Sequence, residues 1–309
     1  MNDYFLFIFG VVCAGIGGEL FVRAAVGMGR WMRVSPGIIG ATFAAFATSS
    51  PELSVSVNAA MAGRPQIALG DALGSNVVNV ALILALALLF SGIQTPRDSV
   101  KRDFPVALLI PILTAALFLD GELSRLDGLL MLGLFIVWLV AAVITARQQR
   151  PAEQETLGKQ EKTRTVLAGV IGLALLMVAG NLIVAGARSI ALSFGMDEFL
   201  IGATIVAVGT SVPELATTLI AKLRGHDDVG LGTILGSNIF NGIFIVAVAA
   251  LIHPINVAWR EIALTLSFGF LVLVSSYPTR QGLIQRWRGF LLLALYAAYL
   301  VALFQFQVV

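Results

Sequence analysis

Two stretches of this 309-residue sequence, GATFAAFATSSPEL (40–53) and GATIVAVGTSVPEL (202–215), decide its architecture. They open two longer segments, 40–79 and 202–241, which align without a gap and share 18 of 40 residues. Each segment ends in a second related block, LGDALGSNVVN or LGTILGSNIFN. The identity lies mostly in polar residues and glycine, so we expect a duplicated functional site and not merely a duplicated helical scaffold.

The composition is that of an integral membrane protein. Hydrophobic residues make up 58% of the chain and charged residues 12%, with a mean hydropathy of +0.92, whereas a soluble domain carries roughly 25% charged residues. The net charge of only +2 gives no reason to expect a nucleic-acid partner. The single cysteine, Cys13, lies in an apolar run and cannot form a disulfide within the chain.

Apolar runs of about 20 residues predict ten membrane-spanning helices. Because each half then has five spans, the second half must cross the membrane in the opposite orientation to the first. We therefore predict an all-α membrane protein of two inverted-topology five-helix repeats: 1–147, a hydrophilic linker at 148–163, and 164–309. The predicted spans are 4–23, 37–61, 67–92, 104–119, 125–146, 164–185, 198–221, 229–252, 260–276 and 288–307.

The distribution of positive charge predicts the orientation. Of the 20 Lys and Arg residues, 16 lie in the loops that follow the odd-numbered spans. Since such residues gather on the cytoplasmic side, we expect linker 148–163 in the cytoplasm and both termini outside a plasma (inner) membrane. The four on the other side are Arg64, Arg125, Arg188 and Arg260.

Glu52 and Glu214 occupy matched positions inside apolar spans. An ionised carboxylate costs about 3 kcal/mol at the centre of a membrane helix, and a bound cation would offset that cost. Pro51 and Pro213, which lack an N–H, should break the helix beside each glutamate and free backbone carbonyls. The neighbouring hydroxyl residues Thr48, Ser49, Thr210 and Ser211 add oxygen ligands suited to a hard cation.

The second block supplies the surface that faces this site. Its glycines should let two helices approach closely. In each copy a serine and an asparagine four residues apart share one helix face. The asparagines are candidates either for ion ligation or for orienting the glutamates. The residues concerned are Gly70, Gly74, Ser75, Asn79, Gly232, Gly236, Ser237 and Asn241.

Two carboxylates balance one divalent cation or two monovalent ones, so Ca²⁺ and Na⁺ could compete for a single site. No histidine or cysteine lies in the motifs, which disfavours zinc and copper. Nucleotide-binding and nucleophile motifs are also absent from the sequence, so we do not expect an enzyme or a cofactor.

The motifs GTSVPE (209–214), ATSSPE (47–52) and the two GSNxxN blocks resemble those of the Ca²⁺/cation antiporter superfamily, specifically sodium/calcium exchanger-like proteins. The resemblance implies alternating access, with Glu52 and Glu214 binding Ca²⁺ together with the carbonyls of Thr48 and Thr210. It implies Na⁺ sites at Ser49, Ser211, Ser75, Ser237 and the carbonyls near Ala45 and Ala207. It also implies that helices 1 and 6 slide across the rest. The expected partners are the two ions and the lipid bilayer, with no obligate protein partner.

Some features depart from the pattern. Ala47 replaces the glycine of the second copy, and Asn241 stands where some relatives, including the K⁺-dependent ones, carry an acid. The asparagine at position 241 disfavours K⁺ dependence. A Ca²⁺/H⁺ or other cation/H⁺ exchanger remains the alternative; a channel or a non-transporting scaffold ranks lower.

Two further acids are open to interpretation. Glu19 either faces a water-filled cavity or lies near a helix end, paired with Arg23 at i+4, and we favour the pair. Asp71 is expected to open the third helix, either as a charge on the helix dipole or as an attractor of cations at the outer mouth.

Overall fold

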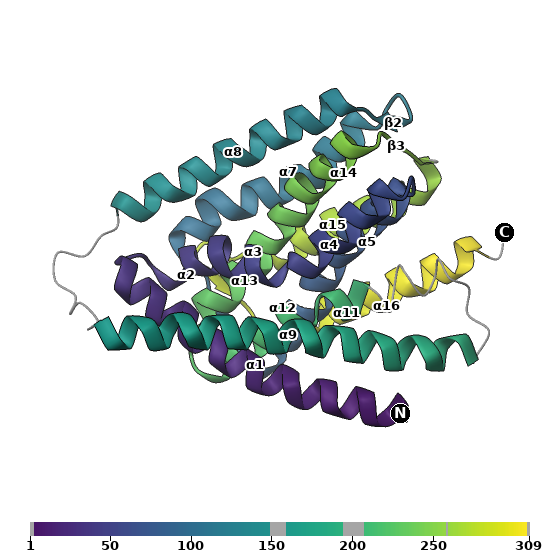
Figure 1. The fold of residues 1–309 in the computed structure, drawn as a ribbon. Coiled ribbons are helices and arrows are strands. Elements are labelled where there is room, and N and C mark those ends of the chain that lie inside the picture. Colours follow the sequence, from purple (N-terminus) through teal and green to yellow (C-terminus); the bar gives the residue numbers. More distant parts are fainter. Residues whose placement is uncertain (1–2, 149–158, 194–206, 258, 308–309) are drawn as a thin grey trace.

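The computed structural model describes residues 3–148, 159–193, 207–257 and 259–307, which form a bundle of helices (Figure 1). The first half comprises α1 Asp3–Met32, α2 Pro36–Ile39, η1 Gly40–Ala44, α3 Ala45–Thr48, α4 Ser50–Met61, α5 Pro65–Val78, η2 Asn79–Leu84, α6 Ala85–Phe90, η3 Ser99–Asp103, α7 Phe104–Leu117 and α8 Arg125–Gln148. The second comprises α9 Lys159–Ser193, α11 Ala207–Thr210, α12 Val212–Leu223, α13 Asp227–Ile239, η5 Phe240–Ile245, α14 Val246–Ile252, α15 Trp259–Ser276 and α16 Trp287–Gln307. The η segments are π-helical turns.

Each of the ten predicted spans contains helix, although residues 198–206 of the seventh span lie outside the described residues. Two spans were predicted too short. The first extends to Met32 and the sixth begins at Lys159, because charged residues such as Arg23 and Lys162 continue the helices beyond the apolar core. Within the described ranges, six helical segments are long and apolar enough to cross a membrane unaided.

The predicted linker 148–163 falls largely outside the described residues. Residues 149–158 are not described, and its last five residues, 159–163, already belong to α9. The motif residues 202–206 are likewise outside the described part of the chain.

Two short antiparallel strand pairs tie the halves together, which the hydropathy pattern did not predict. β1 (Ile93–Gln94) pairs with β4 (Leu283–Ile284), and β2 (Glu122–Leu123) pairs with β3 (Ile255–Asn256). Because α7 separates β1 from β2, the two pairs lie at opposite ends of the bundle. Each pair joins a loop of one repeat to a loop of the other.

The outer helices carry exposed apolar side chains. Leu126 and Val137 on α8, Val170 on α9 and Phe290 on α16 are all more than 60% exposed. Such a surface would be a liability in water but suits contact with lipid tails. The inner helices show the opposite pattern, since nearly every residue of α13 is buried.

Glycine allows α13 to cross α2 and η1 at very short range. A Cβ on Gly232 would overlap the Gly37 carbonyl, one on Gly236 would overlap the Ala41 carbonyl, and one on Gly40 would lie 2.6 Å from the Val229 carbonyl. These contacts confirm the predicted close-packing face of the second copy. For Gly70 of the first copy, no described atom lies within 4 Å of such a Cβ. The segment that matches α2 and η1, 198–206, is outside the described residues.

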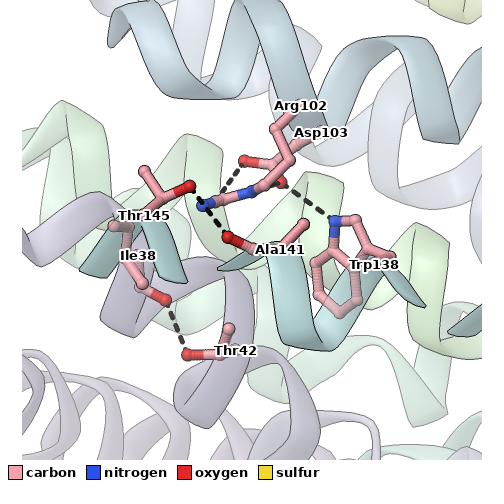
Figure 2. Close-up of polar contacts among 7 residues, drawn as sticks. All are labelled: Ile38, Thr42, Arg102, Asp103, Trp138, Ala141 and Thr145. Atoms are coloured by element: carbon pink, nitrogen blue, oxygen red, sulfur yellow. Dashed lines mark hydrogen bonds and ion pairs between the residues drawn. The ribbon is translucent and has the colours of Figure 1, made fainter. Parts of the chain in front are cut away.

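A buried ion pair fixes the start of α7 against α8 (Figure 2). The Arg102 guanidinium donates to both carboxylate oxygens of Asp103, at 2.7 and 3.0 Å, and the Trp138 indole donates to the same carboxylate at 3.2 Å. Asp103 is completely buried, and the Arg102 side chain is 10% exposed. Asp103 is therefore a buried acid that the protein itself neutralises.

Candidate cation-binding site

The two TSxPE motifs interrupt their helices in the same way. Ser49, with φ −83° and ψ 11°, separates α3 from α4, and Ser211, with φ −82° and ψ 7°, separates α11 from α12. Each break comes two residues before the proline that cannot donate to a helical carbonyl. The breaks are therefore where Pro51 and Pro213 predict them. Pro51 cannot donate to the carbonyl four residues earlier, that of Ala47. The Ala47 carbonyl accepts a backbone N–H at the end of α3 in its place.

The breaks bring the two glutamates into one buried region through reciprocal hydrogen bonds between the repeats. The Ser49 hydroxyl donates to Glu214 at 3.0 Å, and the Ser211 hydroxyl lies 3.4 Å from Glu52. Both carboxylates are completely buried. Each repeat thus supplies one glutamate and the serine that contacts the other repeat's glutamate.

The carboxylates keep free coordination capacity. Glu214 accepts a second bond from Ser237 at 3.1 Å, but the Oε2 atoms of Glu52 and Glu214 are buried and have no hydrogen-bond partner among the described residues. The Ser75 hydroxyl, which matches Ser237, is also buried and has no partner in the part of the chain that the structure describes. Among the described residues, the ion pairs involve neither glutamate.

The threonines at the breaks bond back to their own helices. The Thr48 hydroxyl lies 3.4 Å from the Ala45 carbonyl, and the Thr210 hydroxyl lies 3.2 Å from the Ala207 carbonyl. The same carbonyls also accept the backbone N–H groups of Ser49 and Ser211. Ala45 and Ala207 are thus at the site, with their carbonyls already in local hydrogen bonds.

The asparagines of the GSNxxN blocks form a link between the halves. Asn79 donates to the Asn238 side chain at 3.0 Å. Asn76 and Asn238 each donate to the other's backbone carbonyl, at 3.0 and 3.2 Å. Asn241 is completely buried, and neither of its side-chain polar atoms has a hydrogen-bond partner within the described ranges. We had not singled out Asn76 or Asn238, although their identity in both copies was a usable signal.

A further acid, Asp71, lies beside the site. It is only 5% exposed, and its Oδ1 lies 3.4 Å from the Thr210 hydroxyl. The expectation that Asp71 opens its helix is wrong, because α5 begins at Pro65, whose fixed φ suits the first helical position. Asp71 is therefore in the second turn, inside the protein.

Glu19 is accounted for by ion pairs at the surface. It contacts Arg23 at 2.6 Å and Arg224 at 2.8 Å, and both arginine side chains are more than half exposed. This arrangement confirms the i,i+4 pair and adds a contact between α1 and the end of α12 that the sequence did not reveal.

The site is not a preformed cluster of acids. In the described portion of the chain, no group of three or more His, Cys, Asp or Glu side chains is placed to hold a metal ion together. A cation held here would therefore need neutral oxygen ligands in addition to the two glutamates.

Comparison with known proteins identifies relatives along the whole chain. The family described as "Sodium/calcium exchanger protein" matches residues 3–144 and 165–305. The putative antiporter CaxA of Alkalimonas amylolytica is 40% identical over 243 residues, which cover 76% of each chain. The sodium/calcium exchanger MaX1 of Methanosarcina acetivorans is 28% identical, with 98% of each chain covered. A solved structure of the sodium-calcium exchanger NCX_Mj, soaked with Na⁺ and Sr²⁺, matches with a TM-score of 0.82 at 32% identity, over 97% of this chain and 98% of that one.

Proposed function

The chain belongs to the sodium/calcium exchanger protein family, and on that premise we propose that it exchanges Na⁺ for Ca²⁺ through a site built around Glu52 and Glu214. It is a multi-pass membrane protein with ten helices in two inverted repeats, and a cation antiporter by family. The choice of Na⁺ as the coupling ion and the identity of the ligands are the parts that we propose.

One observation carries the proposal: two fully buried carboxylates, one from each repeat, lack a basic partner among the described residues. Leaving a carboxylate charged without a counter-ion inside a membrane is costly. A cation supplied from solution would remove that cost, and its release would restore it. The same unpaired negative charge therefore explains both why the site binds a cation and why it can release one cation in exchange for another.

The ligand types favour hard cations. Carboxylates, hydroxyls and carbonyls are the oxygen ligands that Ca²⁺ takes, in flexible numbers. Two negative charges balance one Ca²⁺ or two Na⁺, so occupancy by one ion excludes the other. The ligand set that we propose is Glu52, Glu214, Ser49, Ser211, Ser75, Ser237, Asn79, Asn241 and the hydroxyls or carbonyls of Thr48, Thr210, Ala45 and Ala207.

Movement of α1 and α9 is the proposed switch of access. The two helices lie side by side along one face of the bundle (Figure 1). They approach closely, since a Cβ on Gly17 would lie 2.9 Å from the Gly172 carbonyl. Neither helix carries a TSxPE motif, so the pair can slide without dismantling the site. From the charge distribution we propose that the β1–β4 end of the bundle faces the cytoplasm and that both termini lie outside.

The test is ⁴⁵Ca²⁺ uptake into proteoliposomes under imposed Na⁺ and pH gradients. We expect uptake that follows the Na⁺ gradient and stops when that gradient is collapsed. Uptake that follows the pH gradient without Na⁺ would show a Ca²⁺/H⁺ exchanger. Flux that requires neither gradient would show a channel.

A further inference from the structure

A cavity of about 670 Å³ opens at the β1–β4 end of the bundle, and none of its lining residues belongs to the glutamate site. Its walls come from both repeats, residues 94–101 before α7 and residues 277–282 between α15 and α16. The two loops are joined by the β1–β4 pair and by the Thr95 N–H, which donates to the Gly282 carbonyl at 2.7 Å. The cavity is therefore a seam between the repeats whose walls are held in place.

The lining of this cavity is basic. Arg97 and Lys101 come from the first repeat and Arg280 from the second, and no lining residue is acidic. The described ion pairs include none of these three side chains, whereas Arg102 of the same loop is paired with the acid that follows it. Asp98, next to Arg97, is not among the residues that line the cavity. The cavity thus gathers three positive charges that no lining residue neutralises.

Neutral donors add to this positive charge. Thr95 lines the cavity and is 5% exposed, and its hydroxyl has no hydrogen-bond partner in the described part of the chain. A buried hydroxyl without a partner costs free energy that a bound acceptor would recover. The continuous helix of η3 and α7 also begins here, since Val100 and Lys101 in its first turn line the cavity. A helix N-terminus favours anions.

The matched turn at the other end of the bundle has the opposite charge. Gly121 and Gly282 occupy equivalent positions beside the two strand pairs, with φ of +89° and +78°. The turn around Gly121 reads LDGE (119–122), and the turn around Gly282 reads RQGL (280–283). The fold therefore builds the same turn with acids at one end and with an arginine at the other, so the turn itself does not require a basic residue.

The cavity lies at the level where a membrane meets water. Tyr277, which forms part of its wall, is 38% exposed, and Trp287 at the same end is 56% exposed. Tyrosine and tryptophan gather at membrane–water interfaces. The Tyr277 ring packs edge-on against Phe104, with centroids 5.3 Å apart, and its carbonyl accepts a bond from Arg288. This wall is thus fixed at the depth of lipid headgroups.

We propose that the cavity binds an anionic phosphate group through Arg97, Lys101 and Arg280, with the Thr95 hydroxyl as a further donor. Arginine matches phosphate oxygens with two parallel hydrogen bonds, and lysine adds a point charge. The interfacial position favours the phosphate of a lipid headgroup over a soluble one, because basic pockets on the cytoplasmic side of membrane proteins bind anionic headgroups. Since its donors come from both repeats, the site would join the two halves through the bound group. The inference goes beyond the proposed function and does not depend on which ions the glutamates bind.

The first test measures binding of phosphatidylglycerol to the purified full-length protein by native mass spectrometry. Arg280→Gln removes one proposed donor, and Arg286→Gln is the matched control, because Arg286 is an exposed arginine at the same end that does not line the cavity. We expect R280Q to weaken binding about three- to tenfold, the triple variant R97Q/K101Q/R280Q to weaken it more than about tenfold, and R286Q to stay within about twofold of the wild type. Equal binding by R280Q and R286Q would overturn the inference, and this comparison holds even if the triple variant does not fold.

The second test identifies the source of the phosphate from the Tm of the protein. One arm adds phosphatidylglycerol to phosphatidylcholine nanodiscs, and the other adds inorganic pyrophosphate. A rise in Tm with phosphatidylglycerol that the triple variant lacks would identify a lipid headgroup. A rise with pyrophosphate alone, also lost in the triple variant, would identify a soluble phosphate. Without either anion the triple variant should be at least as stable as the wild type, because three like charges no longer repel one another. No rise in the wild type with either probe, or equal rises in the wild type and the triple variant, would refute the site.

Discussion

Two regions of the protein bury carboxylates in opposite ways. Asp103 is completely buried but accepts bonds from Arg102 and Trp138, so its charge is neutralised within the fold. Glu52 and Glu214 are equally buried, yet their contacts are with neutral hydroxyls, such as those of Ser49, Ser211 and Ser237 at 3.0–3.4 Å. No basic side chain among the described residues pairs with either glutamate. The first arrangement holds two helices together. The second leaves negative charge for a mobile cation to neutralise.

The difference separates stability from function. Removing one partner of a buried acid–base pair strongly destabilises the fold, because the other partner is left charged and unpaired. A buried acid without a base is itself a source of instability, which ligand binding relieves. Opposite responses to substitution should therefore distinguish the two regions.

The largest effect is expected from neutralising a glutamate. Glu52→Gln or Glu214→Gln should lower Na⁺-driven Ca²⁺ exchange by at least about 100-fold, because half of the charge that balances Ca²⁺ is lost. Thermal stability without ions should stay equal or rise, since an unpaired buried charge is removed. Flux in proteoliposomes and the Tm in detergent check both parts. A glutamine variant that is less stable than the wild type and still exchanges Ca²⁺ would contradict both parts of this prediction.

The next effect is expected at the paired acid. Arg102→Gln should destabilise the protein by about 3 kcal/mol, because Asp103 would stay buried without its base. The double variant R102Q/D103N should recover most of that loss, as a double-mutant cycle of Tm values would reveal. Exchange per folded molecule should change little. Loss of exchange without loss of stability would place Asp103 among the transport residues.

Smaller effects are expected from the serines that contact the glutamates. Ser49→Ala and Ser211→Ala should each weaken the apparent Ca²⁺ affinity about three- to tenfold, since each removes one contact between the repeats. Ser50→Ala is the matched control, because the Ser50 hydroxyl donates to the Phe46 carbonyl in its own helix at 3.2 Å. The measurement is the Ca²⁺ dependence of exchange. Equal losses in all three variants would argue for a general effect on helix packing.

The smallest effect is expected at the exposed ion pair. Glu19→Gln should change the free energy of unfolding by less than about 1 kcal/mol, because the arginine side chains that it contacts are more than half in solvent. Chemical denaturation in detergent would measure the change. A larger loss of stability would mean that the contact between Glu19 on α1 and Arg224 stabilises the fold more than an exposed ion pair does.

The repeated motifs made the outline of the molecule predictable. Glu52 and Glu214 stood out because an acid in an apolar span is rare, and Pro51 and Pro213 fixed the positions of the breaks through their missing N–H groups. The same reasoning located the glycine face of α13, where small residues recur at helical spacing.

Contacts between distant segments could not be predicted in this way. The hydrogen bonds from Ser49 to Glu214 and from Ser211 to Glu52 depend on how the two repeats pack against each other. Asp71 was misread because its burial is set by the start of α5 at Pro65 and by contact with Thr210 from the other repeat. The pairing of Arg102 with Asp103 was hidden because two adjacent charges look like an ordinary polar loop.

Equilibrium ⁴⁵Ca²⁺ binding to the purified protein tests most directly whether one ion shares the two glutamates. We predict one Ca²⁺ per wild-type chain, displaced by Na⁺, and no measurable site in either Glu52→Gln or Glu214→Gln. Binding of wild-type strength in either variant, or Ca²⁺ that Na⁺ does not displace, would contradict the account.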